Sequence, residues 1–133
     1  MTIIAMGGGM GLTLDTGALL AMERRDRRVL ALLARTAERK ANVTVPAAAL
    51  AQAVRRPVTQ VPLMRLLRQP TTATVPLDRV DALAVGQLLA GSGTTDIADA
   101  HVVVCARRAG QPVVTSDPGD LQRLDPGLPL VVI

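Results

Sequence analysis

The sequence contains no phenylalanine, tyrosine or tryptophan in 133 residues, and it has one cysteine and one histidine. Without aromatic rings the protein cannot stack bases on aromatic side chains, so that class of single-strand nucleic-acid-binding module is excluded. A lone cysteine excludes a disulfide framework and a metal site built on thiolates. Cys105 stands in an apolar stretch, and we expect it to be a small buried side chain.

Long apolar runs are also missing, because none approaches the roughly 20 residues of a membrane-spanning helix. The apolar start of the chain lacks the basic residues of a secretion signal, so we expect a cytoplasmic protein without membrane contact. The glycine-rich segment Gly7–Gly11 fits neither of the common phosphate-binding loops. We therefore expect residues 1–11 to be a flexible leader and residues 12–133 to form one domain.

Lysine is nearly absent, since Lys40 is the one basic residue that is not arginine, and the formal net charge is +4. The planar guanidinium group suits phosphate oxygens, which favours an RNA partner. A high-GC genome would favour the same arginine codons, and both interpretations stay open. The run Arg24–Arg28, together with Glu23, is interpreted as a solvated helix face, with phosphate contact as the alternative.

Short apolar runs alternate with helical patterns along the chain. The predicted strands are residues 12–15, 42–45, 73–75, 112–115 and 130–133. The predicted helices are residues 24–40, 46–56, 63–68, 77–89 and 96–108. This alternation predicts an α/β fold, a three-layer α/β/α sandwich with a parallel sheet of about five strands.

Acidic residues stand where such a sheet gathers its functional groups, beyond the carboxyl ends of the strands. Asp15 ends the first predicted strand and Asp117 ends the fourth. Asp96 and Asp99 begin a helix and lie three residues apart, on one face. Each acid alone could be a helix cap or a turn residue, as Asp117 before Pro118-Gly119 illustrates. Together they predict a common site.

Carboxylates that approach one another repel, and a divalent cation relieves this repulsion. Magnesium prefers oxygen ligands and keeps several waters. It lowers the pKa of a bound water and offsets the charge that develops on a phosphodiester. Several aspartates with one histidine in the whole chain therefore indicate phosphodiester hydrolysis with Mg²⁺, or with Mn²⁺ in its place, rather than zinc chemistry.

Four segments resemble those of VapC-type PIN-domain toxins. They are Leu14–Arg24, Val45–Ala51, Asp96–His101 and Thr115–Leu121. They follow the family's order, and the resemblance extends over residues 12–133. It implies a PIN-like fold and a Mg²⁺-dependent endoribonuclease that is toxic when free. It also implies a small cognate partner, a VapB-like antitoxin, that silences the enzyme.

The resemblance also implies the roles of individual residues. Asp15, Asp99 and Asp117 match family positions that hold the metal and carry catalysis, and Asp96 is an accessory metal ligand. The family's glutamate, on the helix after the second strand, falls on Gln52. The amide keeps an oxygen ligand but carries no charge, so we expect weaker Mg²⁺ binding.

Several further residues have two interpretations. Thr16 and Ser116 stand beside the acids and could assist a carboxylate, a metal-bound water or a phosphate, or could cap a turn. His101 is expected to fill a surface or core position of its helix rather than a catalytic one. The apolar faces of helices 46–56 and 63–68 are core or, if exposed, a surface for a homodimer or an antitoxin.

Two other functions stay open. The first is a degenerate PIN domain that binds RNA or an antitoxin but cuts poorly, because Gln52 is neutral. The second is another phosphate-handling α/β enzyme, a phosphatase or phosphotransfer receiver with Asp15 as the nucleophile. A phosphatase of this kind would usually need an acid where Gly17 stands. A receiver would need a paired acid near the first strand and a lysine on a late strand, and both are missing.

Overall fold

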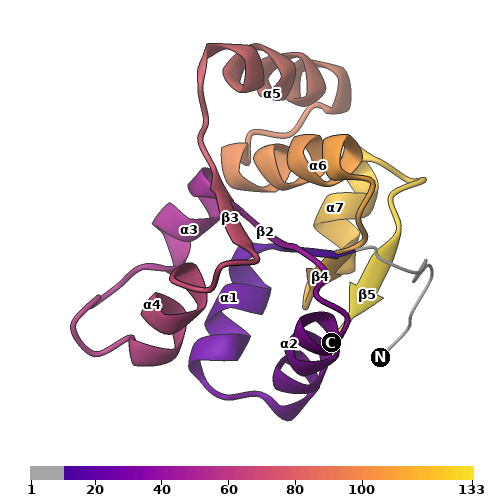
Figure 1. Cartoon of the computed structure of the whole chain (residues 1–133). Helices are drawn as coiled ribbons and strands as arrows, with labels where there is room; N and C mark the ends of the chain where they lie inside the picture. The colour runs from indigo at the N-terminus through magenta and orange to yellow at the C-terminus, as the bar shows by residue number, and fades with distance from the viewer. Residues whose placement is uncertain (1–10) are drawn as a thin grey trace.

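A computed structural model describes residues 11–133, which form an all-parallel sheet between layers of helices (Figure 1). The strands are β1 (Leu12–Leu14), β2 (Val43–Pro46), β3 (Thr72–Val75), β4 (Val113–Thr115) and β5 (Leu130–Val132). This confirms the predicted α/β sandwich with a parallel sheet of five strands. The predicted leader lies outside the described residues except for Gly11, which is buried.

The sheet has the strand order β3-β2-β1-β4-β5, with β1 at its centre. Leu12 and Leu14 of β1 and Val113 and Val114 of β4 are fully buried, because helices cover both faces of a parallel sheet. The chain moves from β1 to β2 and β3 in one direction, and then returns to place β4 on the other side of β1. This change of direction opens a crevice beyond the carboxyl ends of β1 and β4.

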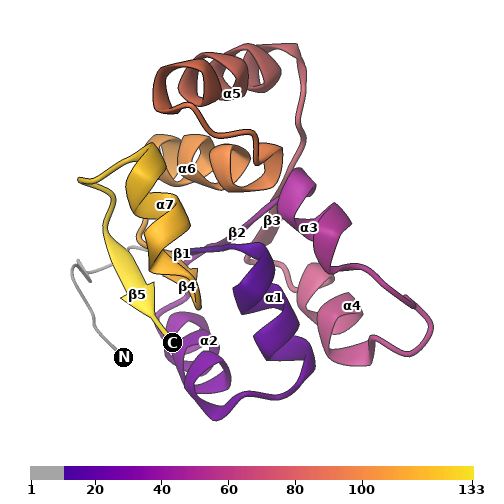
Figure 2. The same cartoon turned by 180° about the vertical axis from the view of Figure 1, so that it is seen from behind.

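Seven helices surround the sheet within the described part of the chain. They are α1 (Thr16–Glu23), α2 (Arg27–Glu38), α3 (Ala47–Ala53), α4 (Val61–Leu67), α5 (Arg79–Ser92), α6 (Ile97–Ala109) and α7 (Pro118–Leu124). Helices α1, α2 and α4 lie on one side of the sheet, and α6 and α7 lie on the other (Figure 2). Helix α3 packs against both α1 and α6, whereas α5 packs on the outer side of α6. None of these helices is long and apolar enough to cross a membrane.

The predicted helix 24–40 is wrong at its start, because α1 and α2 are separated by a turn. Arg25 has a left-handed backbone (φ 59°), which a helix cannot continue through. The Asp26 side chain then accepts hydrogen bonds from the N–H groups of Arg28 and Val29 and caps α2. Glu23 is not simply solvated, since its Oε2 accepts a 3.0 Å hydrogen bond from the Leu63 N–H and so caps α4.

A turn at Pro118-Gly119, one of the two interpretations of this segment, is also wrong. Pro118 opens α7, where its fixed φ suits the first helical position and its missing N–H costs nothing. Leu121 and Leu124 lie three residues apart on one face of α7 and are buried. This helix follows directly on β4 and therefore borders the crevice.

Candidate active site

Asp15 lies directly after β1 and caps α1. Its Oδ1 accepts a 2.8 Å hydrogen bond from the Ala18 N–H, and the residue is 5% exposed. Gly17, in the first turn of α1, lies so close to β4 that a Cβ atom here would be 2.4 Å from Ser116 Oγ. The absence of a side chain at Gly17 thus lets the ends of β1 and β4 meet.

Asp117 stands at the other side of this contact, between β4 and α7. The Thr115 hydroxyl accepts a 2.9 Å hydrogen bond from the Asp117 N–H and also donates to the Asp15 carboxylate. Thr115 is fully buried and therefore ties two of the predicted acids together. The sequence analysis did not single out Thr115, because a threonine at the end of a strand has no distinctive pattern.

Asp96 and Asp99 come from the beginning of α6. Asp96 is the N-cap, and its side chain accepts a 2.9 Å hydrogen bond from the Asp99 N–H. Asp96 is exposed, whereas Asp99 is partly buried. The capping bond therefore fixes the Asp96 carboxylate at the start of α6, beside the backbone of Asp99.

The charges of these acids act on one another. Burial, followed by the negative charges of Asp96, Asp15, Asp120 and Asp117, raises the pKa of Asp99 to about 7. Burial also raises the pKa of Asp15, with a contribution from Asp117, against hydrogen bonds from neighbouring donors that lower it. The structure thus brings all four predicted acids close enough for mutual repulsion.

Asp120 is an acid of this group that was not singled out from the sequence. It lies on α7, three residues after Asp117, which is one helical turn. Together with Asp96, Asp99 and Arg123 it lines a cleft of about 320 Å³. The helical spacing would have revealed Asp120 if α7 had been predicted.

Gln52 and Thr16 meet at the same edge. The Thr16 hydroxyl donates to Gln52 Oε1 at 3.2 Å and lies 3.3 Å from the Ala49 carbonyl. Because Thr16 directly follows Asp15, this contact brings the exposed amide of Gln52 beside the acids.

The side chains at this edge offer only oxygen ligands of the kind that Mg²⁺ prefers. Within residues 11–133, no three of these acids bring carboxylate oxygens within 4.8 Å of one another. A magnesium ion at this edge would therefore keep part of its water shell and contact some carboxylates through water. The donor set and the raised pKa values of Asp15 and Asp99 therefore both fit a hydrated magnesium ion.

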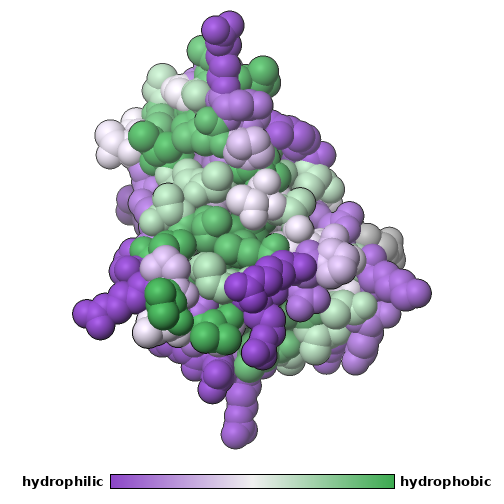
Figure 3. Space-filling view, turned by 60° about the vertical axis from the view of Figure 1, so that its left-hand side comes forward, coloured by the Kyte–Doolittle hydropathy of each residue, from purple (hydrophilic) through white to green (hydrophobic). Residues whose placement is uncertain are grey.

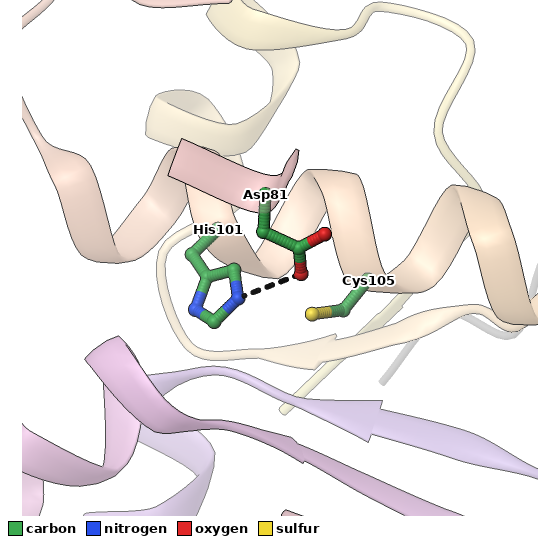
Figure 4. A group of neighbouring side chains, drawn as sticks. All are labelled: Asp81, His101 and Cys105. Carbon is green, nitrogen blue, oxygen red and sulfur yellow. Dashed lines mark hydrogen bonds and ion pairs between the residues drawn. The ribbon is translucent and has the colours of Figure 1, made fainter. Parts of the chain in front are cut away.

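A tighter group of metal-capable side chains lies between α5 and α6, at Asp81, His101 and Cys105 (Figure 4). His101 Nδ1 accepts a hydrogen bond from the Ala48 N–H, so the ring proton is on Nε2 and points to Asp81. The Arg108 guanidinium occupies the other carboxylate oxygen of Asp81, and burial raises the pKa of Cys105 to about 11. With its acceptors occupied and its thiol protonated, this group is better explained as structural than as a metal site.

The raised pKa of Asp99 predicts that metal binding depends on pH. The folded protein without metal keeps a proton on Asp99 below pH about 7, whereas the ordinary value is 3.8. This group's contribution to folding stability is therefore present below pH 3.8 and is lost as the pH rises to about 7. Mg²⁺ must displace the proton, so we expect affinity about tenfold higher at pH 8 than at pH 6.

Isothermal titration calorimetry with Mg²⁺ at the two pH values, in buffers of different ionisation enthalpy, measures both the affinity and the released proton. The Asp99→Asn variant is the control, because it has no carboxyl group to titrate at this position. Equal affinities of the original chain at pH 6 and pH 8 would contradict the prediction.

Comparisons with known proteins agree with this architecture. The family model of the PIN domain matches residues 12–125. Among curated proteins, none matches this sequence. The fold is similar to that of a chain of VapBC2 from Rickettsia felis, solved with a DNA fragment from its promoter. The TM-score is 0.66 at 16% identity, over 93% of this chain and 99% of that one.

Two further solved structures have the same fold. For FitAB bound to an IR36 DNA fragment, the TM-score is 0.63 at 18% identity, over 91% of this chain and 94% of that chain. For FitAcB from Neisseria gonorrhoeae, the TM-score is 0.60 at 22% identity, over 90% of this chain and 95% of that chain. At identities this low, the likeness concerns the fold alone.

Proposed function

Because this chain belongs to the PIN-domain family, whose members are generally nucleases, we propose that it is a Mg²⁺-dependent endoribonuclease. We further propose that it is the VapC-type toxin of a toxin–antitoxin pair that acts on RNA in the cytoplasm. Asp15, Asp99 and Asp117 would hold the metal and carry catalysis. Asp96 would assist in metal binding, and Gln52, Ser116 and Thr16 would be accessory.

The observation that carries this proposal is the mutual repulsion of acids from distant parts of the chain. The pKa of Asp99 is about 7 because it is partly buried near the charges of Asp15, Asp96, Asp117 and Asp120. Such a concentration of negative charge opposes folding unless a cation or protons offset it. Charge clustering of this kind is typical of functional sites.

The residues of the chain prepare the site in two ways. The Ala18 N–H and the Thr115 hydroxyl hold the Asp15 carboxylate, and the Thr115 hydroxyl also holds the backbone of Asp117. Asp99 loses its proton and becomes a charged ligand as the pH rises above about 7. Bound Mg²⁺ would supply a water of lowered pKa and offset the charge that develops on the phosphodiester.

Incubation of the purified chain with single-stranded and structured RNAs, with and without Mg²⁺, tests the proposed function. We expect internal cleavage with Mg²⁺ and none after chelation with EDTA. A phosphatase or phosphotransfer receiver would instead form a beryllofluoride adduct at Asp15. Absence of metal-dependent cleavage from both the original chain and the Gln52→Glu variant would exclude the nuclease.

The alternative of a weakened PIN domain keeps one specific observation in its favour. The exposed side chain that meets Thr16 at the site is the uncharged amide of Gln52, not the glutamate expected from the family resemblance. A chain with one negative charge fewer at this site would still bind its partners, but it would bind Mg²⁺ only weakly. The Gln52→Glu variant described in the Discussion separates the two functions.

A groove of about 440 Å³ is the place we propose for the antitoxin. It runs between α1, α2 and α4, and its apolar lining includes Met22, Leu33 and Val61, with Arg25 and Arg65 also among the lining residues. Such a groove suits an apolar segment that carries acidic residues. Two of the chains of similar fold come from VapBC2 and FitAB, each solved with a DNA fragment. Co-expression with the product of a neighbouring small reading frame should give a complex that does not cleave RNA.

Helix α5 suggests a second partner, another copy of this chain. Its outer face exposes Val80 and Leu83, by 69% and 64%, and Leu77, just before the helix, is 37% exposed. Figure 3 shows green apolar surface at the top of the molecule, where α5 lies. Neighbouring apolar side chains of this size are typical of an interface. We therefore propose a homodimer through α5.

The homodimer predicts a solution mass near twice 13.9 kDa, measured by light scattering. The Leu83→Asp variant should be a monomer at the same concentration, because a charge would be buried in the interface. Ala82→Asp introduces the same side chain at an exposed position on another face of α5 and is the control for a general effect of charge on this helix. A monomeric original chain would rule out the homodimer.

A further inference from the structure

Helix α3 begins without a cap of its own. Its N-cap position is Pro46, whose side chain makes no capping hydrogen bond. The first N–H groups of a helix have no partner within the helix, and a buried one needs a partner elsewhere. For Ala48, this partner is His101 Nδ1 on α6, at 3.4 Å. A side chain from a distant helix therefore supplies the cap that the local sequence lacks.

His101 is held in this role by groups on its other side. It is fully buried, and its Nε2 donates to Asp81 Oδ2 of α5 at 3.3 Å. Asp81 is 2% exposed and forms an ion pair with Arg108 of α6, which keeps its carboxylate charged. The charged carboxylate fixes the ring proton on Nε2 and leaves Nδ1 free to accept. This chain of contacts runs from Arg108 through Asp81 and His101 to the Ala48 N–H.

Both ends of the His101–Ala48 bond lie on helices that carry residues of the proposed site. On α6, Asp99 precedes His101 by two residues. On α3, Gln52 follows Ala48 by four residues, which is one helical turn and the same face of the helix. On its other side α3 contacts Thr16, whose hydroxyl donates to Gln52 Oε1 and lies 3.3 Å from the Ala49 carbonyl. The orientation of α3, and with it the distance between Gln52 and Asp99, thus depends on the His101 cap and the Thr16 contacts together with the packing of α3 against α1 and α6.

We infer that His101 is a positioning residue, which caps α3 from α6 and so holds Gln52 opposite Asp99. This role rests on the proposed function, because His101 is buried and takes no direct part in the proposed cleavage of RNA. The inference also gives a role to a fully buried histidine, two residues from Asp99, whose two ring nitrogens both have hydrogen-bond partners.

Two substitutions at His101 separate capping from burial. In His101→Asn the side-chain oxygen takes the place of Nδ1 and can still accept from Ala48. In His101→Gln the amide takes the place of Nε2 and can still contact Asp81, but the acceptor for Ala48 is lost. Both remove the imidazole ring, so we expect similar losses of thermal stability. A difference between the two variants in hydrogen exchange at Ala48 or in metal affinity therefore reports on the cap of α3.

We expect hydrogen exchange at the Ala48 amide to be about five- to tenfold faster in His101→Gln than in His101→Asn. Mn²⁺ affinity, measured by titration calorimetry, should be about tenfold weaker in His101→Gln, as for other residues that orient metal ligands. His101→Asn should remain close to the original chain in both measurements. Equal exchange and equal affinity in the two variants would overturn the inference.

The original chain provides a test that needs no variant. Nitrogen NMR of His101 should show the tautomer with its proton on Nε2, and the tautomer protonated on Nδ1 would overturn the inference, because it could not accept from Ala48. Failure of the proposed function gives a different result. A chain that neither binds Mn²⁺ nor cleaves RNA excludes the nuclease, while the tautomer and the Ala48 exchange still decide whether His101 caps α3.

Discussion

Replacing Asp99 by asparagine should lower Mg²⁺-dependent RNA cleavage at least ~100-fold and at the same time make the metal-free protein more stable above pH 7. Activity falls because the variant loses a charged oxygen ligand in the middle of the acidic group. Stability rises because the remaining charges of Asp15, Asp96, Asp117 and Asp120 lose the neighbour that they repel. Opposite changes of activity and stability are characteristic of a residue kept for function.

Initial cleavage rates and thermal unfolding at pH 8, both with and without Mg²⁺, measure the two effects. Asp78→Asn is the matched control, since Asp78 caps α5, takes no part in raising the pKa of Asp99, and asparagine caps helices as well as aspartate does. The control should match the original chain in both measurements. If Asp99→Asn kept full activity, the metal site as proposed would be refuted.

Replacing Gln52 by glutamate should raise cleavage at limiting Mg²⁺ about tenfold. The new carboxylate would stand where Thr16 now donates to the amide, and would add a charge to a site whose metal affinity depends on charge. The same charge should lower the stability of the metal-free chain, because it would join acids that already repel one another. Cleavage rates over a Mg²⁺ series, together with calorimetric affinities, measure the change.

The same variant distinguishes a working nuclease from a weakened one. If only Gln52→Glu cleaves RNA, the chain as it stands is a binding protein. If both cleave strongly and equally, the amide suffices and the binding-only alternative is rejected. Gln87→Glu makes the same substitution at an exposed position of α5 and should leave the rate unchanged.

The sheet and the convergence of the four acids could be predicted because each depends on local patterns. Apolar runs such as 112–115 mark buried strands, and an acid after a run marks the carboxyl end of the strand. Parallel pairing then brings Asp15 and Asp117 to one edge of the sheet, whatever the details of the helices. The helix boundaries were less accurate, since the left-handed turn at Arg25 depends on how α1 and α2 pack.

The residues that sequence reasoning missed are defined by contacts across the fold. Thr115 matters through its bonds to two acids, and Glu23 caps a helix forty positions further along the chain. His101 was placed correctly within its helix, but its partners Ala48 and Asp81 come from two other helices. No spacing along the chain reveals such partners.

The position of β1 in the middle of the sheet has a consequence for synthesis on the ribosome. Thr13 of β1 pairs on one side with Thr44 and on the other with Val113. A growing chain can therefore build one half of the sheet early, whereas the acids after β4 are added only once β4 has been made. Because domains fold as units once their parts are available, a chain that has not reached β4 lacks Asp117 and Asp120 and, under the proposed function, could not yet cleave RNA.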